Sequence, residues 1–381
     1  MSNEEVRPFR IEVPQKQLDE LARRLDETRW PDGSPGVGWS QGIPLDYTRE
    51  LAEYWRSEYD WRAQEERLNS YSQFKTLING PDVHFIHVRS PHDGAMPLIL
   101  THGWPGSIVE FLDVIGPLTD PVAHGGSAAD AFHVVVPSLP GFGFSGPRPA
   151  GWANKDTAKA WAELMRRLGY DRYTAHAGDL GHAVSHELGV IDSEHMAALH
   201  LTGLMAGSVN AQNVNLDDPT EKRDLELQQR FDQELGAYAQ LQMTRPQSLS
   251  YALADSPVGQ LAWIVERFRD WTAAKDVPED VIDRDAMLNN VMFYWLTNTA
   301  GSTARWYWEM IREPGPFQPL SPVPTAFAIA PDDIFHPVRR LAENHANIVR
   351  WTELARGGHF IAMEQPDLLV ADLRESFRPY R

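Results

Sequence analysis

The segment that most constrains this chain is Ala177-Gly178-Asp179-Leu180-Gly181. It follows residues 172–175, which predict a β-strand, and it precedes the amphipathic stretch 182–190, which predicts a helix. A sharp turn from strand to helix needs small residues on both flanks, because the backbone at its tip is strained and packs closely against its neighbours. The side chain that such a turn exposes is Asp179.

Two interpretations of Asp179 follow from this position. Unpaired N–H groups and the dipole at a helix N-terminus keep a carboxylate ionised and can also hold an oxyanion, so Asp179 is a candidate covalent nucleophile. The same strand, turn and helix, with Ser in the centre, form the nucleophile elbow of α/β-hydrolases. The simpler interpretation is a helix N-cap after a glycine turn.

Strand-like and helix-like stretches alternate through most of the chain. Strands that alternate with helices build a mostly parallel sheet with helices on both faces. The sequence therefore predicts the α/β class and, with the turn at Asp179, an α/β-hydrolase fold. The expected strands cover residues 74–78, 83–88, 98–100, 132–137, 172–175, 195–204, 324–330 and 348–353.

The pattern also divides the chain into three parts. Residues 1–90 are expected to form an N-terminal extension that wraps the core, with helices at 14–25, 51–56 and 61–68. Residues 91–204 and 323–381 are expected to form the core, and residues 205–322 a helical lid. The expected lid helices cover 225–241, 256–271, 285–296 and 303–311.

Composition excludes several classes of function. A formal net charge of −18 over 381 residues disfavours binding to nucleic acid or to an anionic membrane. The chain has no cysteine, so thiolate catalysis and Cys-ligated metal sites are excluded. We find no apolar run near the roughly 20 residues that span a bilayer and no signal-peptide core in residues 1–10. A cytoplasmic protein is therefore expected.

A second motif follows the strand at 98–100. His102-Gly103-Trp104-Pro105 is a turn whose backbone can approach a ligand closely, and the corresponding loop of α/β-hydrolases supplies one N–H group of the oxyanion hole. The donor here would be Trp104, whereas His102 is expected to shape the loop. Ser145 is not a second elbow, because Pro147 follows it and no helix-like stretch does.

An acid and a base complete the order found in α/β-hydrolases, which is nucleophile, acid, base. His359 lies in Gly357-Gly358-His359-Phe360. Asp333 follows the strand-like run 324–330 and lies 26 residues before His359 (359 − 333). Asp332 is the alternative acid, since loop spacing varies by a residue. Together the motifs predict a catalytic triad.

These motifs resemble those of the microsomal-type epoxide hydrolases, including soluble bacterial members and the insect juvenile-hormone enzymes. The resemblance covers nearly the whole chain and rests on residues 7–9, 102–107, 178–179, 244–246, 255–259 and 356–360. It implies that Asp179 is the nucleophile, His359 the base and Asp333 the acid. It also implies that Tyr238 and Tyr307 are the two catalytic lid tyrosines.

The resemblance implies the following chemistry. Tyr238 and Tyr307 would hydrogen-bond the epoxide oxygen while Asp179 attacks a ring carbon to give an ester. His359 would then activate the water that hydrolyses this ester to a vicinal diol. The N–H groups of Trp104 and Leu180 would hold the oxyanion. No metal or organic cofactor is required, and the partners are an epoxide and water.

The expected substrate is hydrophobic or aryl, because the lid is rich in aromatic residues. Detoxification and natural-product assembly, such as an enediyne pathway, are the expected settings, and a homodimer is left open. The attack position, the stereochemistry and the natural substrate do not follow from the sequence. The residues expected to contact substrate are Trp104, Pro105, Phe144, Tyr238, Tyr307 and Phe360.

Two alternatives and one departure accompany this prediction. Leu180 stands where the family usually has Trp, which puts the substrate range in question. Haloalkane dehalogenases also use an elbow Asp, but their Trp at this position donates an N–H to the halide, which Leu180 cannot do. A non-catalytic protein that binds a small ligand is disfavoured, because it would be expected to lack one or more of the triad residues.

His182 and His186 lie four residues apart on the expected helix 182–190, as zinc ligands do in some metalloproteases. That pattern needs Glu directly after the first His, and Ala183 stands there. Core histidines are therefore the favoured interpretation, and no metal site is predicted.

Overall fold

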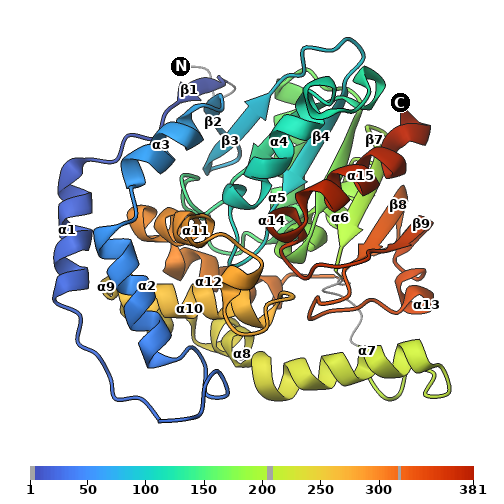
Figure 1. Cartoon of the computed structure of the whole chain (residues 1–381). Coiled ribbons are helices and arrows are strands. Elements are labelled where there is room, and N and C mark those ends of the chain that lie inside the picture. Colours follow the sequence, from blue (N-terminus) through green and yellow to red (C-terminus); the bar gives the residue numbers. More distant parts are fainter. Residues whose placement is uncertain (1–4, 204–208, 316–318) are drawn as a thin grey trace.

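The computed structural model describes residues 5–203, 209–315 and 319–381. Within them, nine strands form one sheet in the order β1-β2-β3-β5-β4-β6-β7-β8-β9 (Figure 1). The strands are β1 (Arg7–Phe9), β2 (Gln73–Leu77), β3 (Asp82–Val88), β4 (Met96–Thr101), β5 (Phe132–Pro137), β6 (Tyr173–Ala177), β7 (Met196–Thr202), β8 (Ser321–Ile329) and β9 (Ala346–Glu353).

The sheet is antiparallel from β1 to β5 and parallel from β5 to β9, which confirms the predicted α/β class. The register aligns Ile99 of β4 with Ala175 of β6, Ala175 with Leu199 of β7, and Leu199 with Thr325 of β8. Because parallel strands end at the same edge, the loops after these four strands meet there. The predicted motifs lie at this edge: Trp104 follows β4, Asp179 follows β6, Asp333 follows β8 and His359 follows the neighbouring β9.

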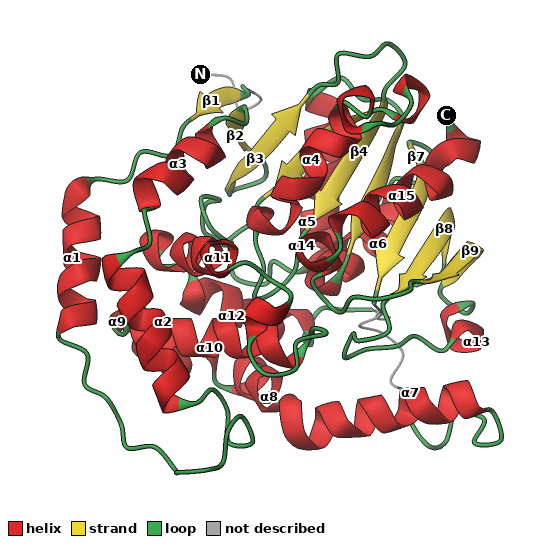
Figure 2. Cartoon of the chain, in the orientation of Figure 1, coloured by secondary structure: helices red, strands yellow, loops and turns green. Residues whose placement is uncertain are grey.

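Helices cover both faces of the sheet. Figure 2 shows α4 (Leu112–Thr119) and α15 (Pro366–Phe377) in front of the strands, and α5 (Asn154–Arg167) and α6 (Asp179–Ile191) behind them. A strand buried on both faces is apolar throughout. In β5, Phe132 and the three consecutive valines 134–136 are fully buried.

The described part of the lid lies beyond the edge at which the parallel strands end (Figure 1). Met205, where the lid was expected to begin, falls outside the described residues. The helices are α7 (Pro219–Arg230), α8 (Ala237–Thr244), α9 (Pro246–Asp255), α10 (Pro257–Asp270), α11 (Arg284–Thr297) and α12 (Ala300–Met310).

The prediction of one continuous helix over residues 225–241 is wrong. A π-turn at Phe231–Leu235 interrupts this segment, and in it the Gly236 N–H donates to the Phe231 carbonyl over 2.7 Å. The separate helix α9 was not predicted, although Pro246 at its first turn is a usual start signal. Proline fits that position because the first N–H groups of a helix have no partner in the helix.

The N-terminal extension contains α1 (Gln15–Asp26), α2 (Leu45–Ser57) and α3 (Trp61–Asn69). The structure adds β1, which was not predicted because it has only three residues and contains Pro8, a residue that sheets accept at an edge. The helices contact the lid: the Tyr47, Tyr54 and Tyr59 hydroxyls donate to Glu279, Asp285 and Asn289, respectively. The extension therefore joins the sheet edge and also supports the lid.

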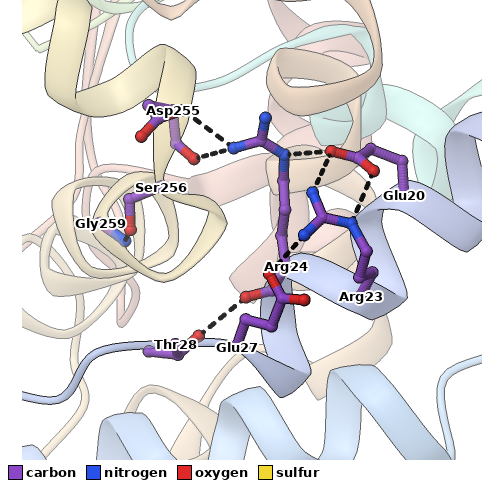
Figure 3. A network of polar contacts seen from close by, with 8 residues as sticks. All are labelled: Glu20, Arg23, Arg24, Glu27, Thr28, Asp255, Ser256 and Gly259. Carbon is purple, nitrogen blue, oxygen red and sulfur yellow. Dashed lines mark hydrogen bonds and ion pairs between the residues drawn. The ribbon is translucent and has the colours of Figure 1, made fainter.

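A polar network links α1 to the junction of α9 and α10 (Figure 3). The Arg24 guanidinium donates to the carbonyl and carboxylate of Asp255, over 2.6 and 2.9 Å, and to Glu20, over 2.8 Å. The Ser256 hydroxyl accepts from the Gly259 N–H and caps α10. Exposed ion pairs contribute about 0–1 kcal/mol each, so this network orients the extension more than it stabilises the fold.

None of the helices formed by the described residues is long and apolar enough to cross a lipid bilayer.

Candidate active site

The turn at Asp179 is strained and tightly packed. Asp179 begins α6 with a φ of +50°, a conformation that costs a non-glycine residue about 1–3 kcal/mol. Small neighbours permit it. A Cβ on Gly181 would lie 2.2 Å from the Thr101 carbonyl oxygen, and a Cβ on Gly103 would lie 2.3 Å from the Asp179 side chain. The turn thereby holds a buried carboxylate above the end of β6.

The two carboxylate oxygens of Asp179 have different surroundings. Oδ1 accepts the Trp104 N–H over 2.8 Å and the Leu180 N–H over 2.7 Å. Oδ2 lies 3.3 Å from His359 Nε2. The arrangement holds Oδ1 where negative charge can be stabilised and leaves Oδ2 as the oxygen able to form a bond. Both predicted oxyanion-hole donors therefore meet the predicted nucleophile.

His359 lies between two carboxylates. Its Nε2 faces Asp179, and its Nδ1 lies 2.9 Å from Asp333 Oδ1. All three side chains are nearly buried, with exposed fractions of 4–7%. The structure thus pairs Asp333 with His359, whereas Asp332 donates a backbone hydrogen bond to the Gly357 carbonyl over 3.0 Å.

The loop that carries His359 is held from two sides. The Glu364 carboxylate accepts the N–H groups of Gly358 and Phe360 over 3.0 and 3.1 Å. The His359 N–H donates to the Trp271 carbonyl at the end of α10 over 2.8 Å. The imidazole position therefore depends on the lid as well as on the core.

The charge state of His359 is set by the same carboxylates. Burial alone would lower the pKa of His359, but Asp333 and then Asp179 outweigh it and raise this pKa well above its usual value. The imidazole is therefore positively charged while both carboxylates are ionised. Loss of the negative charge on Asp179 would remove one of these causes and favour the neutral imidazole, which can act as a base.

Tyr238 of α8 and Tyr307 of α12 lie above Asp179 in the buried core of the lid. The Trp104 ring stacks on Tyr238 at a centroid distance of 4.8 Å and stands perpendicular to Tyr307 at 5.9 Å. The Tyr307 hydroxyl is buried and interacts with the Tyr238 hydroxyl, but it makes no well-formed hydrogen bond to a described residue. A buried donor without a well-formed hydrogen bond is costly, which is typical of a group that binds a ligand.

The two phenols are protonated at neutral pH. Burial raises the pKa of Tyr238, and the charge on Asp179 raises it further, while Tyr307 and the Arg267 guanidinium partly offset this rise. Burial also raises the pKa of Tyr307 well above its usual value. Both side chains are therefore hydrogen-bond donors. Arg267 lies over the Tyr238 ring at 5.1 Å, as in a cation–π contact.

The other residues expected to contact substrate lie in different parts of the structure. Pro105 belongs to the loop of Trp104, and its carbonyl accepts from Asn290 over 2.6 Å. The Phe360 ring lies 5.1 Å from the His359 ring. Phe144 lies elsewhere, packed against Phe9, His84 and Phe293 near the antiparallel edge. Phe142, two residues earlier, lies beside His102, with 5.5 Å between the ring centroids.

Several residues that hold the site were not predicted. Asn290 and Tyr294 of α11 donate to the carbonyls of Pro105 and Gly106, over 2.6 and 2.8 Å, and tie the lid to the oxyanion loop. A buried Asn in an apolar helix is a weak signal for such a contact. Trp271 contacts Trp104 and His359. Nothing local in the sequence identifies these long-range contacts.

The histidines considered for other roles bond to the backbone. His182 Nδ1 and His186 Nε2 lie 2.9 and 2.6 Å from the carbonyls of Gly203 and Pro319. His102 bonds the Gly103 carbonyl and accepts the Leu139 N–H, so it shapes its loop. Among the residues that the structure describes, no group of three or more His, Asp or Glu side chains could hold a metal ion.

Comparisons with known proteins agree along the whole chain. The family described as "Epoxide hydrolase N terminus" matches residues 6–111, and "Alpha/beta hydrolase family" matches residues 98–373. A Stigmatella aurantiaca protein named "Putative epoxide hydrolase" is 47% identical over 99% of this chain and 86% of its own length. "Epoxide hydrolase 1" of Sus scrofa is 33% identical over 98% of this chain and 88% of its own. The structure of Aspergillus niger epoxide hydrolase superposes with a TM-score of 0.86, at 30% identity, over 99% of this chain and 97% of that one.

Proposed function

The chain belongs to the epoxide hydrolases of the α/β-hydrolase fold and is related to the microsomal enzymes, and from this membership we propose that it opens epoxides through a covalent ester on Asp179. The observation that carries the proposal is that the two oxygens of the Asp179 carboxylate have different partners. Two N–H groups hold Oδ1, and Oδ2 faces the imidazole.

In the first step, Asp179 Oδ2 attacks a ring carbon of the epoxide. The carbon–oxygen bond breaks as the Tyr238 and Tyr307 hydroxyls donate to the leaving oxygen, and one phenol gives up its proton. The products are an ester on Asp179 and a tyrosinate. The Tyr307 hydroxyl supports this role, since it makes no well-formed hydrogen bond to a described residue and an epoxide oxygen would supply an acceptor.

Before the second step, the proton of the charged His359 imidazole passes to the tyrosinate, which restores the phenol and leaves Nε2 free. Water then attacks the ester carbon of Asp179 and loses a proton to His359 Nε2. Negative charge develops on Oδ1, which the Trp104 and Leu180 N–H groups already bind. Asp333 holds the imidazole and stabilises its positive charge. Collapse of the intermediate releases the diol and restores the carboxylate, and His359 keeps the proton from water, which restores the charged imidazole of the resting site.

A haloalkane dehalogenase is not supported. The residue after the nucleophile is Leu180, whose fully buried side chain has no N–H to donate to a halide. The relatives that share the whole chain are named epoxide hydrolases. All three triad residues are present, whereas a non-catalytic ligand-binding relative would be expected to have lost at least one of them.

We further propose a hydrophobic or aryl epoxide as substrate. The groups around the proposed attack position are aromatic: Trp104, Tyr238 and Trp271 contact one another. Apolar burial of an aryl group against such rings contributes about 25 cal/mol per Å² of covered surface. Epoxides of this kind occur in both detoxification and natural-product assembly, which are the proposed biological roles.

Incubation with styrene oxide tests the proposed activity. The expected product is the vicinal diol, formed with no added metal or cofactor. The same preparation is expected to release no halide from 1-chlorohexane. Halide release without diol formation across a panel of aryl and alkyl epoxides would contradict the proposal.

Replacing the lid tyrosines is expected to slow ester formation selectively. Tyr238→Phe and Tyr307→Phe should each reduce the rate by about 10–100-fold, and the double variant by more, because proton donation typically contributes about 10²–10⁴-fold. Stopped-flow tryptophan fluorescence at excess enzyme measures this step. Tyr251→Phe is the control, since Tyr251 is 70% exposed on α9. Equal rates for the double variant and the control would remove the tyrosines from the mechanism.

A further inference from the structure

A small cavity lies against Asp179. Its volume is about 20 Å³, and Asp179, His359, Glu110 and His176 contribute to its lining. Of the described residues, neither lid tyrosine belongs to this lining. A space of roughly 10–15 Å³ suffices for one water, which needs two to four polar partners. The cavity therefore has the size and the polar wall for a single water beside the nucleophile.

Glu110 reaches this cavity from the short helix η1 (Ile108–Phe111), which the Ser107 hydroxyl caps. Its carboxyl group lies over the backbone of Gly106: a Cβ on Gly106 would be 1.2 Å from Glu110 Oε1. Any side chain at position 106 would displace the carboxyl group. Glycine at this position is thus a condition for the placement of Glu110.

The surroundings of Glu110 favour its neutral form. Burial raises the pKa of Glu110 to about 8, with His359 opposing and Asp179 adding to this rise. A neutral carboxyl group can accept a hydrogen bond without placing a second negative charge beside Asp179. The proposed mechanism leaves this polar group unused.

His176 also contributes to the lining of the cavity. Its Nδ1 lies 2.9 Å from His200 Nδ1, and His200 Nε2 lies 3.0 Å from Asp372 Oδ2. Because the Asp372 carboxylate can only accept, His200 donates from Nε2 and accepts at Nδ1. His176 then donates from Nδ1 and has Nε2 as an acceptor. Burial lowers the pKa of His176 well below its usual value, so this wall is neutral.

We propose that this cavity holds the water that hydrolyses the ester and that Glu110 is its positioning residue. The inference rests on the covalent mechanism proposed above. One water is consumed in each turnover, and it must reach Asp179 while the substrate occupies the side of the tyrosines. A cavity that is lined by Asp179 but by neither tyrosine meets this requirement.

In this proposal, each O–H group of the water has its own acceptor. One O–H donates to His359 Nε2 and transfers its proton there, while the other O–H donates to the Glu110 carbonyl oxygen. The oxygen lone pair is then directed at the carbon of the ester, and a new carbon–oxygen bond forms as the proton leaves. Glu110 transfers no proton and acts by fixing the orientation of the water.

Glu110→Leu should separate the two steps of the reaction. Leucine fills a similar volume and accepts no hydrogen bond, so we expect ester hydrolysis to slow about 10–100-fold, while ester formation changes less than about threefold. Glu110→Gln retains a carbonyl acceptor and should stay within about fivefold of the wild type in both steps. Rapid quench with styrene oxide, followed by intact-protein mass, measures the ester over time.

Two further variants complete the test. Gly106→Ala should displace the carboxyl group and slow hydrolysis in the same selective way, even if Glu110→Leu does not fold. Glu187→Leu is the matched control, because Glu187 is a buried glutamate at the other end of α6, and it should leave the ratio of the two rates unchanged.

Ester hydrolysis at the wild-type rate in Glu110→Leu would overturn the inference. Equal slowing of both steps would overturn it as well, since that is the effect of a merely structural residue. Failure of the covalent mechanism itself would look different, because the wild-type enzyme would then form no ester.

Discussion

Replacing His359 with glutamine is expected to stop the reaction at the ester on Asp179. Glutamine keeps polar atoms near Asp179 and Asp333 but cannot take a proton from water. Turnover should fall at least about 10³-fold, while ester formation continues, because the base is needed only for the second step. Intact-protein mass after mixing with styrene oxide should show one added substrate mass per chain, and peptide mapping should place it on Asp179.

The electrostatics of the site also predict how the wild-type hydrolysis rate depends on pH. Two carboxylates raise the pKa of His359, and ester formation neutralises one of them. In the wild-type enzyme, the hydrolysis rate should therefore fall on the acid side, where the imidazole of the ester intermediate is protonated. His195→Gln, which replaces an exposed ring, is the control. Multiple turnovers by His359→Gln, or no added mass, would contradict the assignment.

Removal of the nucleophile is expected to have the largest effect on activity. Asp179→Ala and Asp179→Asn should reduce diol formation by at least about 10⁴-fold and abolish the ester, because neither side chain supplies a carboxylate oxygen for attack. Asparagine is the more informative change, since it preserves the shape of the side chain. Product analysis by gas chromatography measures the loss.

The same change has an expected effect on stability. Asp179 carries backbone strain of about 1–3 kcal/mol, so a variant that relaxes the turn does not have to destabilise the fold. Asp179→Ala should melt within a few degrees of the wild type. Asp217→Asn, at an exposed position, controls for surface charge. Diol formation by Asp179→Asn within tenfold of the wild type would show that Asp179 is not the nucleophile.

The parts of the site that the sequence predicts are those built from local backbone geometry. The turn at Asp179 needs small residues within two positions, and the loop of Trp104 follows directly from its strand. Both patterns are therefore visible in a few consecutive residues. The sheet makes their meeting predictable, because parallel strands end at one edge.

The parts that the sequence does not predict depend on contacts between distant segments. Glu110 reaches the cavity only because Gly106 has no side chain. Asn290 donates to the carbonyl of Pro105, which is 185 residues away in the sequence. The packing of Phe144 against Phe9 and Phe293 is likewise a contact between distant segments. Its contact with substrate stays a prediction. The π-turn that divides the helix expected at 225–241 has no signature in the apolar pattern.

A single turnover in oxygen-18 water tests the central claim most directly. Enzyme in excess over styrene oxide is mixed in labelled water, and the diol and the peptide that contains Asp179 are both analysed by mass spectrometry. The covalent mechanism predicts label in the Asp179 carboxylate and unlabelled oxygen in the diol, since the diol takes its oxygen from the enzyme. Label in the diol with none in Asp179 would mean that water opens the epoxide directly, and it would contradict the proposed role of Asp179.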